Sequence, residues 1–187
     1  MRRARLATLE TIEAAVWDEL AGCIADKSHP WRTPVLATVD GHGAHARADA
    51  RTVVLRELDA ARRELRLYGD ARAAKVDQLR AAPHGTLVMW SPALGWQLRC
   101  RVILSIQTEG PEVAARWARL ARTPAAQDYL SPLPPGARLD TIPAEPLARE
   151  HFAVVTARVT MIDWLELHAD GHRRASFSAG RAHWLQP

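Results

Sequence analysis

PVLATVDGHGAHARADARTVVLRELDAARRELRLY, residues 34–68, reads as a run of short extended segments separated by turns. Asp40-Gly41-His42-Gly43 is a turn signal, and residues 57–63 are polar and turn-like. Residues 64–68 alternate polar and apolar side chains, as a half-buried strand does. The stretch therefore predicts a meander of antiparallel strands over residues 34–39, 46–50, 52–56 and 64–68.

Helices are expected on both sides of this meander. A first helix, ending near Asp26, follows from an apolar stripe at three- and four-residue spacing: Leu9, Ile12, Val16, Leu20 and Ile24. Asp70 is a good N-cap for a second helix that Pro83 ends. Pro111 stands at the favoured first position of a third helix over residues 112–121.

Further strands are expected at residues 85–91, 96–108, 152–163 and 172–177. Strands and helices do not alternate regularly, so the sequence predicts a mainly β protein with peripheral helices, an antiparallel barrel that is closed or nearly closed. The length of 187 residues fits a single domain, 1–187. We expect residues 1–28 to be a helical segment. Residues 124–148, rich in proline, are expected to form an arm over the surface or onto a partner subunit.

Composition and charge exclude several classes of protein. The net charge of +4 is too small to indicate a nucleic-acid partner, and the arginines are spread over the chain rather than gathered in a run, which argues against one. No apolar run is long enough to span a membrane. Cys23 and Cys100 match no metal-binding or redox spacing and suit a reducing compartment. We therefore expect a cytoplasmic protein without a bound metal.

Two motifs bring cations to the ends of predicted strands. In RTVVLR, Arg51 and Arg56 would lie on opposite faces of a regular strand, so they share a ligand only across a bulge or bend. In YGDARAAK, residues 68–75, Arg72 and Lys75 fall at the predicted helix start. Cations normally avoid this end of a helix, whereas phosphate is favoured there. The second motif indicates either an anionic ligand or a solvated helix face.

Two weaker motifs lie further along the chain. In WQLR, residues 96–99, the amide of Gln97 could bind the edge of a planar heterocycle. Trp164, in IDWLEL, is either a core residue or the wall of a ring pocket, and DGHRR follows at residues 170–174. The glycine-rich and catalytic motifs of common nucleotide-binding and hydrolytic enzymes are missing from the sequence.

In this order, the four motifs resemble the pyridoxamine 5′-phosphate oxidase-like family of FMN-binding split barrels. The family patterns R-x-V-x-L-K/R and Y/F-x-D-x-R-S-x-K match RTVVLR and YGDARAAK. The pattern W…Q-x-R matches Trp90 with residues 97–99, and Trp164 with residues 172–174 fits the last strands. The resemblance runs from about Pro30 to the C-terminus and implies an antiparallel split β-barrel that binds FMN.

The resemblance also implies roles for individual residues. Arg72 and Lys75 would hold the FMN phosphate, and Tyr68 and Gly69 would approach the isoalloxazine or the ribityl chain. Gln97 would bond a flavin edge from the other subunit, and Trp164 and Arg174 would close the pocket. The cofactor would be lined by the first motif: Arg51, the backbone of Thr52, Val53, Val54 and Leu55, and Arg56.

The family resemblance implies a homodimer with FMN at the subunit interface and a small-molecule substrate. Three departures argue against pyridoxamine phosphate as that substrate: Arg56 replaces a lysine, residues 117–127 lack the expected tyrosine and serine, and Asp170 replaces an arginine. Ala73 replaces a serine, which would cost the FMN phosphate one hydrogen bond. An FMN-dependent oxidoreductase is the leading hypothesis. The alternatives are a non-catalytic flavin carrier or sensor and, less favoured, a nucleic-acid binder. Relatives of this barrel also leave a deazaflavin or haem open as the cofactor.

Overall fold

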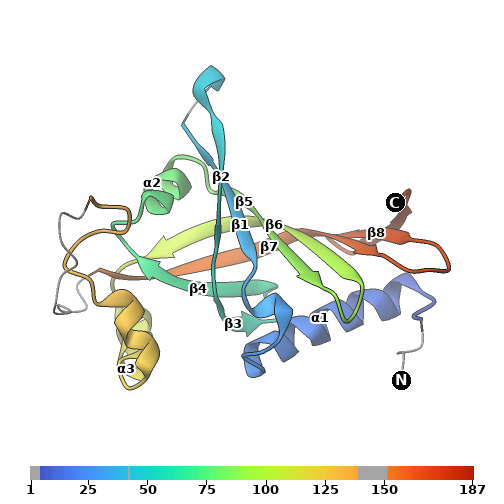
Figure 1. Cartoon of the computed structure of the whole chain (residues 1–187), viewed down its shortest axis with the longest axis horizontal. Coiled ribbons are helices and arrows are strands. Elements are labelled where there is room, and N and C mark those ends of the chain that lie inside the picture. The colour runs from blue at the N-terminus through green and yellow to red at the C-terminus, as the bar shows by residue number, and fades with distance from the viewer. Residues whose placement is uncertain (1–4, 42, 139–150) are drawn as a thin grey trace.

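The computed structural model describes residues 5–41, 43–138 and 151–187. Within them, nine strands form one sheet with three α-helices around it (Figure 1). The helices are α1 (Leu9–Ala25), α2 (Ala74–Ala81) and α3 (Pro111–Leu120). The strands are β1 (Val35–Asp40), β2 (Arg47–Thr52), β3 (Leu55–Asp59), β4 (Glu64–Asp70), β5 (His84–Ser91), β6 (Trp96–Gln107), β7 (Phe152–Glu166), β8 (Arg173–Ser178) and β9 (Arg181–Leu185).

The strand pairs are antiparallel, in the order β2-β1-β5-β6-β7-β4-β3, with β8 on β7 and β9 on β8. The long β7 splits the sheet, because residues 152–158 pair with β4 and residues 162–166 pair with β8. A register shift at Arg101/Val102 bends β6 against β7 between these two parts. The sheet is not closed, and the predicted mainly β, antiparallel split-barrel architecture is confirmed.

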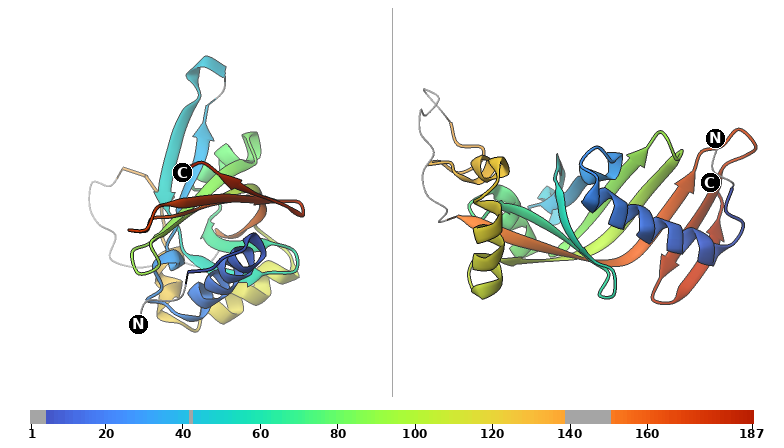
Figure 2. Two further views of the ribbon diagram at one scale, coloured as in Figure 1. Left: turned by 90° about the vertical axis from the view of Figure 1, so that its right-hand side faces the viewer. Right: turned by 90° about the horizontal axis from the view of Figure 1, so that it is seen from below.

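The main core lies between the inner face of the sheet and α1 (Figure 2). The predicted apolar stripe of α1 is confirmed where Ile12, Val16 and Leu20 are fully buried. Each such side chain contributes about 1.5–3 kcal/mol by leaving water. A tryptophan cluster continues this core, with ring centroids 6.5 Å and 5.4 Å apart along the series Trp31, Trp96 and Trp164.

A second, smaller core covers the opposite face of the sheet at the β4 end of β7. Here α3 places Trp117 against Phe152, with ring centroids 5.3 Å apart, and Tyr68 lies 5.0 Å from the same phenyl ring. Pro111 begins α3, as its sequence position predicts. None of the described helices covers the remainder of this sheet face, which is called the open face below. It carries Val35, Val39, Trp90, Gln97, Arg99, Arg174 and Leu185.

Several local predictions were wrong. Asp70 does not cap α2, since the N-cap is Ala73 and the Asp70 carboxylate instead accepts a hydrogen bond from the Arg72 backbone N–H at 2.8 Å. Residues 52–56 are not one extended strand, because the chain leaves β2 at Thr52 and donates the Val53 N–H to Pro34 before β3 begins. Part of the predicted turn at 57–63 is strand β3, and β9 was not predicted at all.

Residues 124–148, the predicted arm, are described only as far as residue 138. They begin with a 3-10 helix, Pro124–Tyr129, whose Ala126 is buried in the second core. Residues 139–148 of the arm, and residues 1–4 of the helical segment 1–28, lie outside the described residues. Among the described helices, none combines the length and apolar character that crossing a membrane requires.

Candidate functional site

The turn from β4 into α2, residues 69–75, brings the Lys75 side chain against Gly69. The Lys75 side chain lies against Gly69 so closely that a Cβ there would stand 3.1 Å from both Cε and Nζ. Within the described chain, the Lys75 ammonium has no hydrogen bond or ion pair. Burial, and then the charge of Arg51, lower the pKa of Lys75, while Asp70 opposes this shift. Because Ala73 cannot cap α2, the positive end of the helix also lacks a side-chain partner.

Arg51 lies beside this turn but is held by residues of its own chain. Its guanidinium donates to the Thr38 hydroxyl at 2.6 Å and to Gln78 Oε1 at 2.9 Å, and it pairs with Asp49. Gln78, on α2, also donates to the Asp49 carboxylate at 2.7 Å. The hydrogen bond from Gln78 lowers the pKa of Asp49, with Arg51 adding to the effect. Arg51 is therefore fixed in direction and partly neutralised.

Arg72 is occupied even more fully. It makes a two-point ion pair with Asp70, with Nε–Oδ1 at 3.0 Å and Nη2–Oδ2 at 2.7 Å. Burial alone would raise the pKa of Asp70, but the hydrogen bonds from Arg72 outweigh it and hold the pKa low. The same guanidinium donates to three successive carbonyls, of Ser131, Pro132 and Leu133. Arg72 thus ties the 69–75 turn to the start of the arm.

The rest of the first motif is divided between the core and the α3 side. Arg56 reaches the α3 side, where it donates to Tyr129 Oη at 3.1 Å and lies 5.9 Å from the centre of the Tyr68 ring. Burial, and then the hydrogen bond to Glu57, raise the pKa of Tyr68 to about 12. The intervening residues differ in exposure: Thr52 is exposed, Val54 half-buried, and Val53 and Leu55 are buried.

Gln97, on β6, and Arg174, on β8, both lie on the open face. Figure 1 shows β8 far along the sheet from α2. Strand register places Trp90, Gln97, Leu165 and Arg174 in one row across β5, β6, β7 and β8. The Gln97 amide has no hydrogen-bond partner in the described part of the chain. Arg174 makes a two-point pair with Asp163, at 3.0 Å and 2.7 Å, and Arg99 binds the same carboxylate.

Trp164 projects from the other face of β7 and is fully buried between Trp96 and the rest of the core. It can support a cofactor site only from within the core. The predicted residues therefore form separate groups: one at the 69–75 turn with Arg51, one on the α3 side, and one on the open face. The partners that orient the arginines were not predicted: Asp49 and Gln78 for Arg51, and Asp163 for Arg174.

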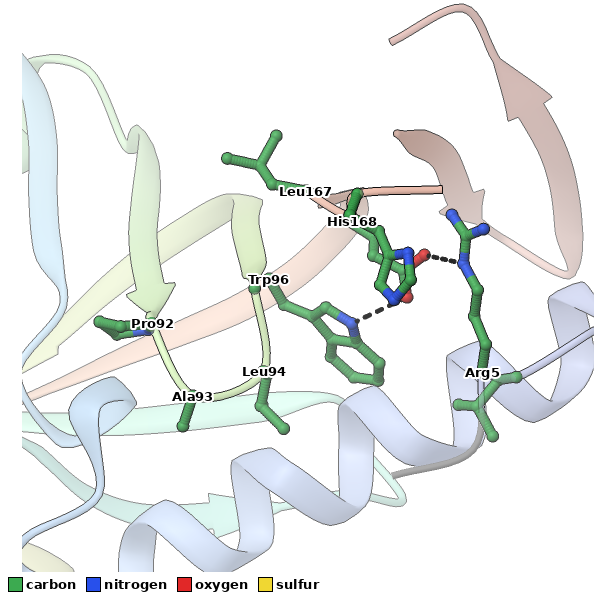
Figure 3. A pocket seen from close by; sticks show the side chains of 11 residues that line it. Arg5, Pro92, Ala93, Leu94, Trp96, Leu167 and His168 are labelled. Carbon is green, nitrogen blue, oxygen red and sulfur yellow. Dashed lines mark hydrogen bonds and ion pairs between the residues drawn. The ribbon is translucent and has the colours of Figure 1, made fainter. Parts of the chain in front are cut away.

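A distinct pocket of about 320 Å³ lies near the N-terminal segment (Figure 3). Arg5 donates to the Glu166 carboxylate at 2.7 Å, and the Trp96 indole N–H reaches the same group at 3.4 Å. Arg173 adds a third donor to Glu166 at 2.9 Å. This pocket includes none of the predicted cofactor residues, and its Arg5, Trp96 and Glu166 side chains hydrogen-bond to one another.

A family model described as pyridoxamine 5′-phosphate oxidase, FMN-binding domain, matches residues 14–107. This match covers just over half of the 187 residues. The chain belongs to this family. The matched part of this pyridoxamine 5′-phosphate oxidase FMN-binding domain protein runs from α1 to the end of β6, and it includes Arg51, the 69–75 turn and Gln97.

Solved structures confirm the fold of this family member. A pyridoxamine 5′-phosphate oxidase-related, FMN-binding protein from Nostoc punctiforme has a TM-score of 0.75 at 22% identity, covering 98% of this chain and all of that one. PhzG from Burkholderia lata, solved with tetrahydrophenazine-1-carboxylic acid, has a TM-score of 0.73 at 14% identity over the full length of both chains. A heme-binding protein from Mycobacterium smegmatis has a TM-score of 0.52 at 21% identity, covering 86% of this chain and 57% of that one. No curated protein sequence matches the chain.

Proposed function

We propose that this protein binds FMN and works as a flavin-dependent oxidoreductase on a small molecule. The observation that carries the proposal is the 69–75 turn, a cradle in which Lys75 makes no hydrogen bond or ion pair with the described residues and Gly69 leaves room for its ammonium group. This cradle, in a chain of an FMN-binding domain family, fits a phosphate group. Lys75 would be the main phosphate ligand, joined by those N–H groups of Arg72 and Arg51 that their carboxylate partners leave available.

FMN, when bound, supplies the electron-transfer chemistry, while the protein supplies position and electrostatics. The extended backbone at residues 52–55 would line the flavin, with Tyr68 and Gly69 beside its ring or ribityl chain. Arg56, next to Tyr68 and Tyr129, would border the substrate side. The Gln97 amide and Arg174 would meet the polar edge of the ring, and Trp164 would support them through the core.

A second copy of the chain is part of this proposal. Gln97 and Arg174 lie on the open face, whereas Lys75 is at the α2 end of the sheet, so the groups do not form one pocket within a chain. The open face also exposes large apolar side chains, including Trp90 at 42% and Val39 at 43%. A homodimer would cover this face and bring Gln97 of one protomer to Lys75 of its partner.

The first experiment identifies the chromophore of the purified, full-length protein. Expression should give yellow protein whose extracted flavin is FMN, and added FMN should bind to any empty protein. A haem spectrum, or an extracted deazaflavin, would show that haem or a deazaflavin is the cofactor in place of FMN. Protein that stays colourless and does not bind added FMN would refute the proposal. Nucleic-acid binding that is unaffected by FMN would favour a nucleic-acid-binding protein instead.

A mixing experiment tests the shared site. Lys75→Met and Gln97→Ala are each expected to weaken FMN binding in homodimers. In a mixed dimer of the two variants, one site contains both substitutions and the other contains neither. Random exchange should therefore restore about a quarter of the sites to full affinity. If each site lies within one chain, mixing restores none.

A non-catalytic flavin carrier or sensor is the second candidate. The contacts of Arg56 favour this candidate, because Arg56 would border the substrate but already binds Tyr129 and lies over the Tyr68 ring. Asp170, where oxidases of this type are expected to have an arginine, is exposed and would repel an anionic substrate. FMN-loaded protein that is not reduced by NAD(P)H, and does not oxidise small amines or alcohols, would support this candidate over the oxidoreductase.

A further inference from the structure

The open face carries an ion cluster of which the family resemblance assigns only Arg174 to the cofactor pocket. Asp163, in the middle strand β7, accepts hydrogen bonds from Arg99 on β6 and from Arg174 on β8. The Asp163 side chain is only 11% exposed, whereas those of Arg99 and Arg174 are 43% and 29% exposed. The carboxylate therefore lies under two guanidinium groups that face outward.

Arg174 shares a cross-strand row with Gln97, and the other two members of the cluster, Arg99 and Asp163, lie in the next row on the same face. Arg99 is directly opposite Asp163 in the register, and Gln97 is opposite Leu165, which in turn is opposite Arg174. Neighbouring strands are about 4.8 Å apart, so Gln97 and Arg174 are about 10 Å apart across β7. This spacing matches a planar ring system lying over the strand between them.

The cluster retains an unused positive charge and an unused donor. Two guanidinium groups and one carboxylate leave a formal charge of +1. The Nε of Arg99 is buried and has no hydrogen-bond partner among the described residues. A buried donor without a partner is costly, and a net positive cluster favours a ligand edge that carries negative charge.

We propose that Asp163 is a positioning residue for the flavin, fixing Arg174 and Arg99 so that their net charge stabilises the reduced ring. This rests on the proposed FMN site and gives a role to two residues to which the family resemblance assigns none, Arg99 and Asp163. A flavin that accepts two electrons gains negative charge on its pyrimidine edge, and a nearby cation stabilises that form over the oxidised form. The cluster would thereby set the midpoint potential.

The test is a reductive titration of FMN-loaded protein against a reference dye, with two substitutions of opposite charge effect. Asp163→Asn changes the cluster charge from +1 to +2, and Arg99→Gln changes it to zero. We expect Asp163→Asn to raise the affinity for reduced relative to oxidised FMN by about tenfold, which is about 30 mV for a two-electron couple. Arg99→Gln should shift the potential by a similar amount in the other direction.

The same strand provides a matched control. Glu166, three residues on, binds Arg5 and Arg173 on the opposite face and is buried to a similar degree. Glu166→Gln breaks a comparable pair of ionic contacts and should leave the potential unchanged. Shifts of the same sign in Asp163→Asn and Arg99→Gln, no shift in either, or an equal shift in Glu166→Gln would each overturn the inference. Wild-type protein that binds no FMN would instead remove the proposed function on which it depends.

Discussion

Gly69→Ala should weaken FMN binding through Lys75 while leaving the fold intact. The added Cβ would be 3.1 Å from both Cε and Nζ of Lys75, closer than ordinary van der Waals contact. The backbone at Gly69 is ordinary strand, so alanine introduces no φ strain. The end of a lysine side chain is flexible, and we expect it to move away by a few tenths of an ångström. The substitution therefore changes the position of the ammonium group and little else.

The size of the effect follows from the hydrogen bond that is disturbed. A hydrogen bond between charged groups contributes about 1.5–3 kcal/mol, so its full loss in Lys75→Met should raise the FMN dissociation constant by about 10- to 100-fold. Displacing the ammonium group without removing it should cost about 1 kcal/mol, or roughly fivefold. In the double variant, Gly69→Ala should add almost nothing to Lys75→Met, because residues acting through one another are not additive.

Titration by quenching of flavin fluorescence measures these constants, with riboflavin as the ligand that lacks the phosphate. Riboflavin affinity should be the same in the wild type and in Gly69→Ala. Gly22→Ala is the matched control, since a Cβ there meets nothing within 4 Å and the residue is exposed on α1. An equal loss of riboflavin and FMN affinity in Gly69→Ala would show that Gly69 contacts the ring or ribityl chain. Additive losses in the double variant would refute the coupling to Lys75.

Three other substitutions test the surroundings of the site. Ala73→Ser should cap α2, raise the free energy of unfolding by about 1 kcal/mol and tighten FMN binding, as denaturant melts and titration would show. Glu166→Gln should lower stability by about 1–3 kcal/mol at neutral pH, since charged donors Arg5 and Arg173 lose their acceptor. Burial would raise the pKa of Glu166, but the hydrogen bonds from Arg173 and Arg5 outweigh it and hold that pKa low. The stability that ionised Glu166 contributes is therefore lost as the pH falls through this lowered pKa. The difference in stability between wild type and Glu166→Gln should shrink in the same pH range. Arg72→Gln should release the arm and speed limited proteolysis near residue 133, because three backbone carbonyls lose their donor.

Strands and helices could be predicted where the apolar periodicity agrees with residues, such as proline, that begin or end an element. The α1 stripe, the start of α3 at Pro111 and the end of α2 before Pro83 were all correct. The Asp70 cap was wrong because two interactions compete for one carboxylate, and the guanidinium of Arg72 outweighs the helix N–H groups. Strand β9 was missed because only its pairing with β8 makes it a strand, and its sequence lacks a strong alternation.

The candidate site could be predicted as a set of cations but not as an arrangement. Sequence motifs identified Arg51, Arg72 and Arg174, yet each proves to have a carboxylate partner. Asp49 and Asp70 are each two residues before their arginines, but only Asp49 and Arg51 share a strand, β2, whose alternation puts both side chains on one face. Asp163 is eleven residues from Arg174 and meets it only through the β7–β8 register. No local pattern could have indicated that pairing.

In the proposed FMN site, these pairings decide how much positive charge is left for the phosphate. At the α2 end, Arg51, Arg72 and Lys75 are set against Asp49 and Asp70, which leaves a formal charge of +1. The open-face cluster has the same formal charge. Phosphate recognition at this proposed site would depend on the Lys75 ammonium, which has no ion pair among the described residues, beside arginines whose charge is partly neutralised, rather than on a strong positive field. Such a site gains its affinity from fixed geometry, which is why a shift of Lys75 by a few tenths of an ångström should be measurable.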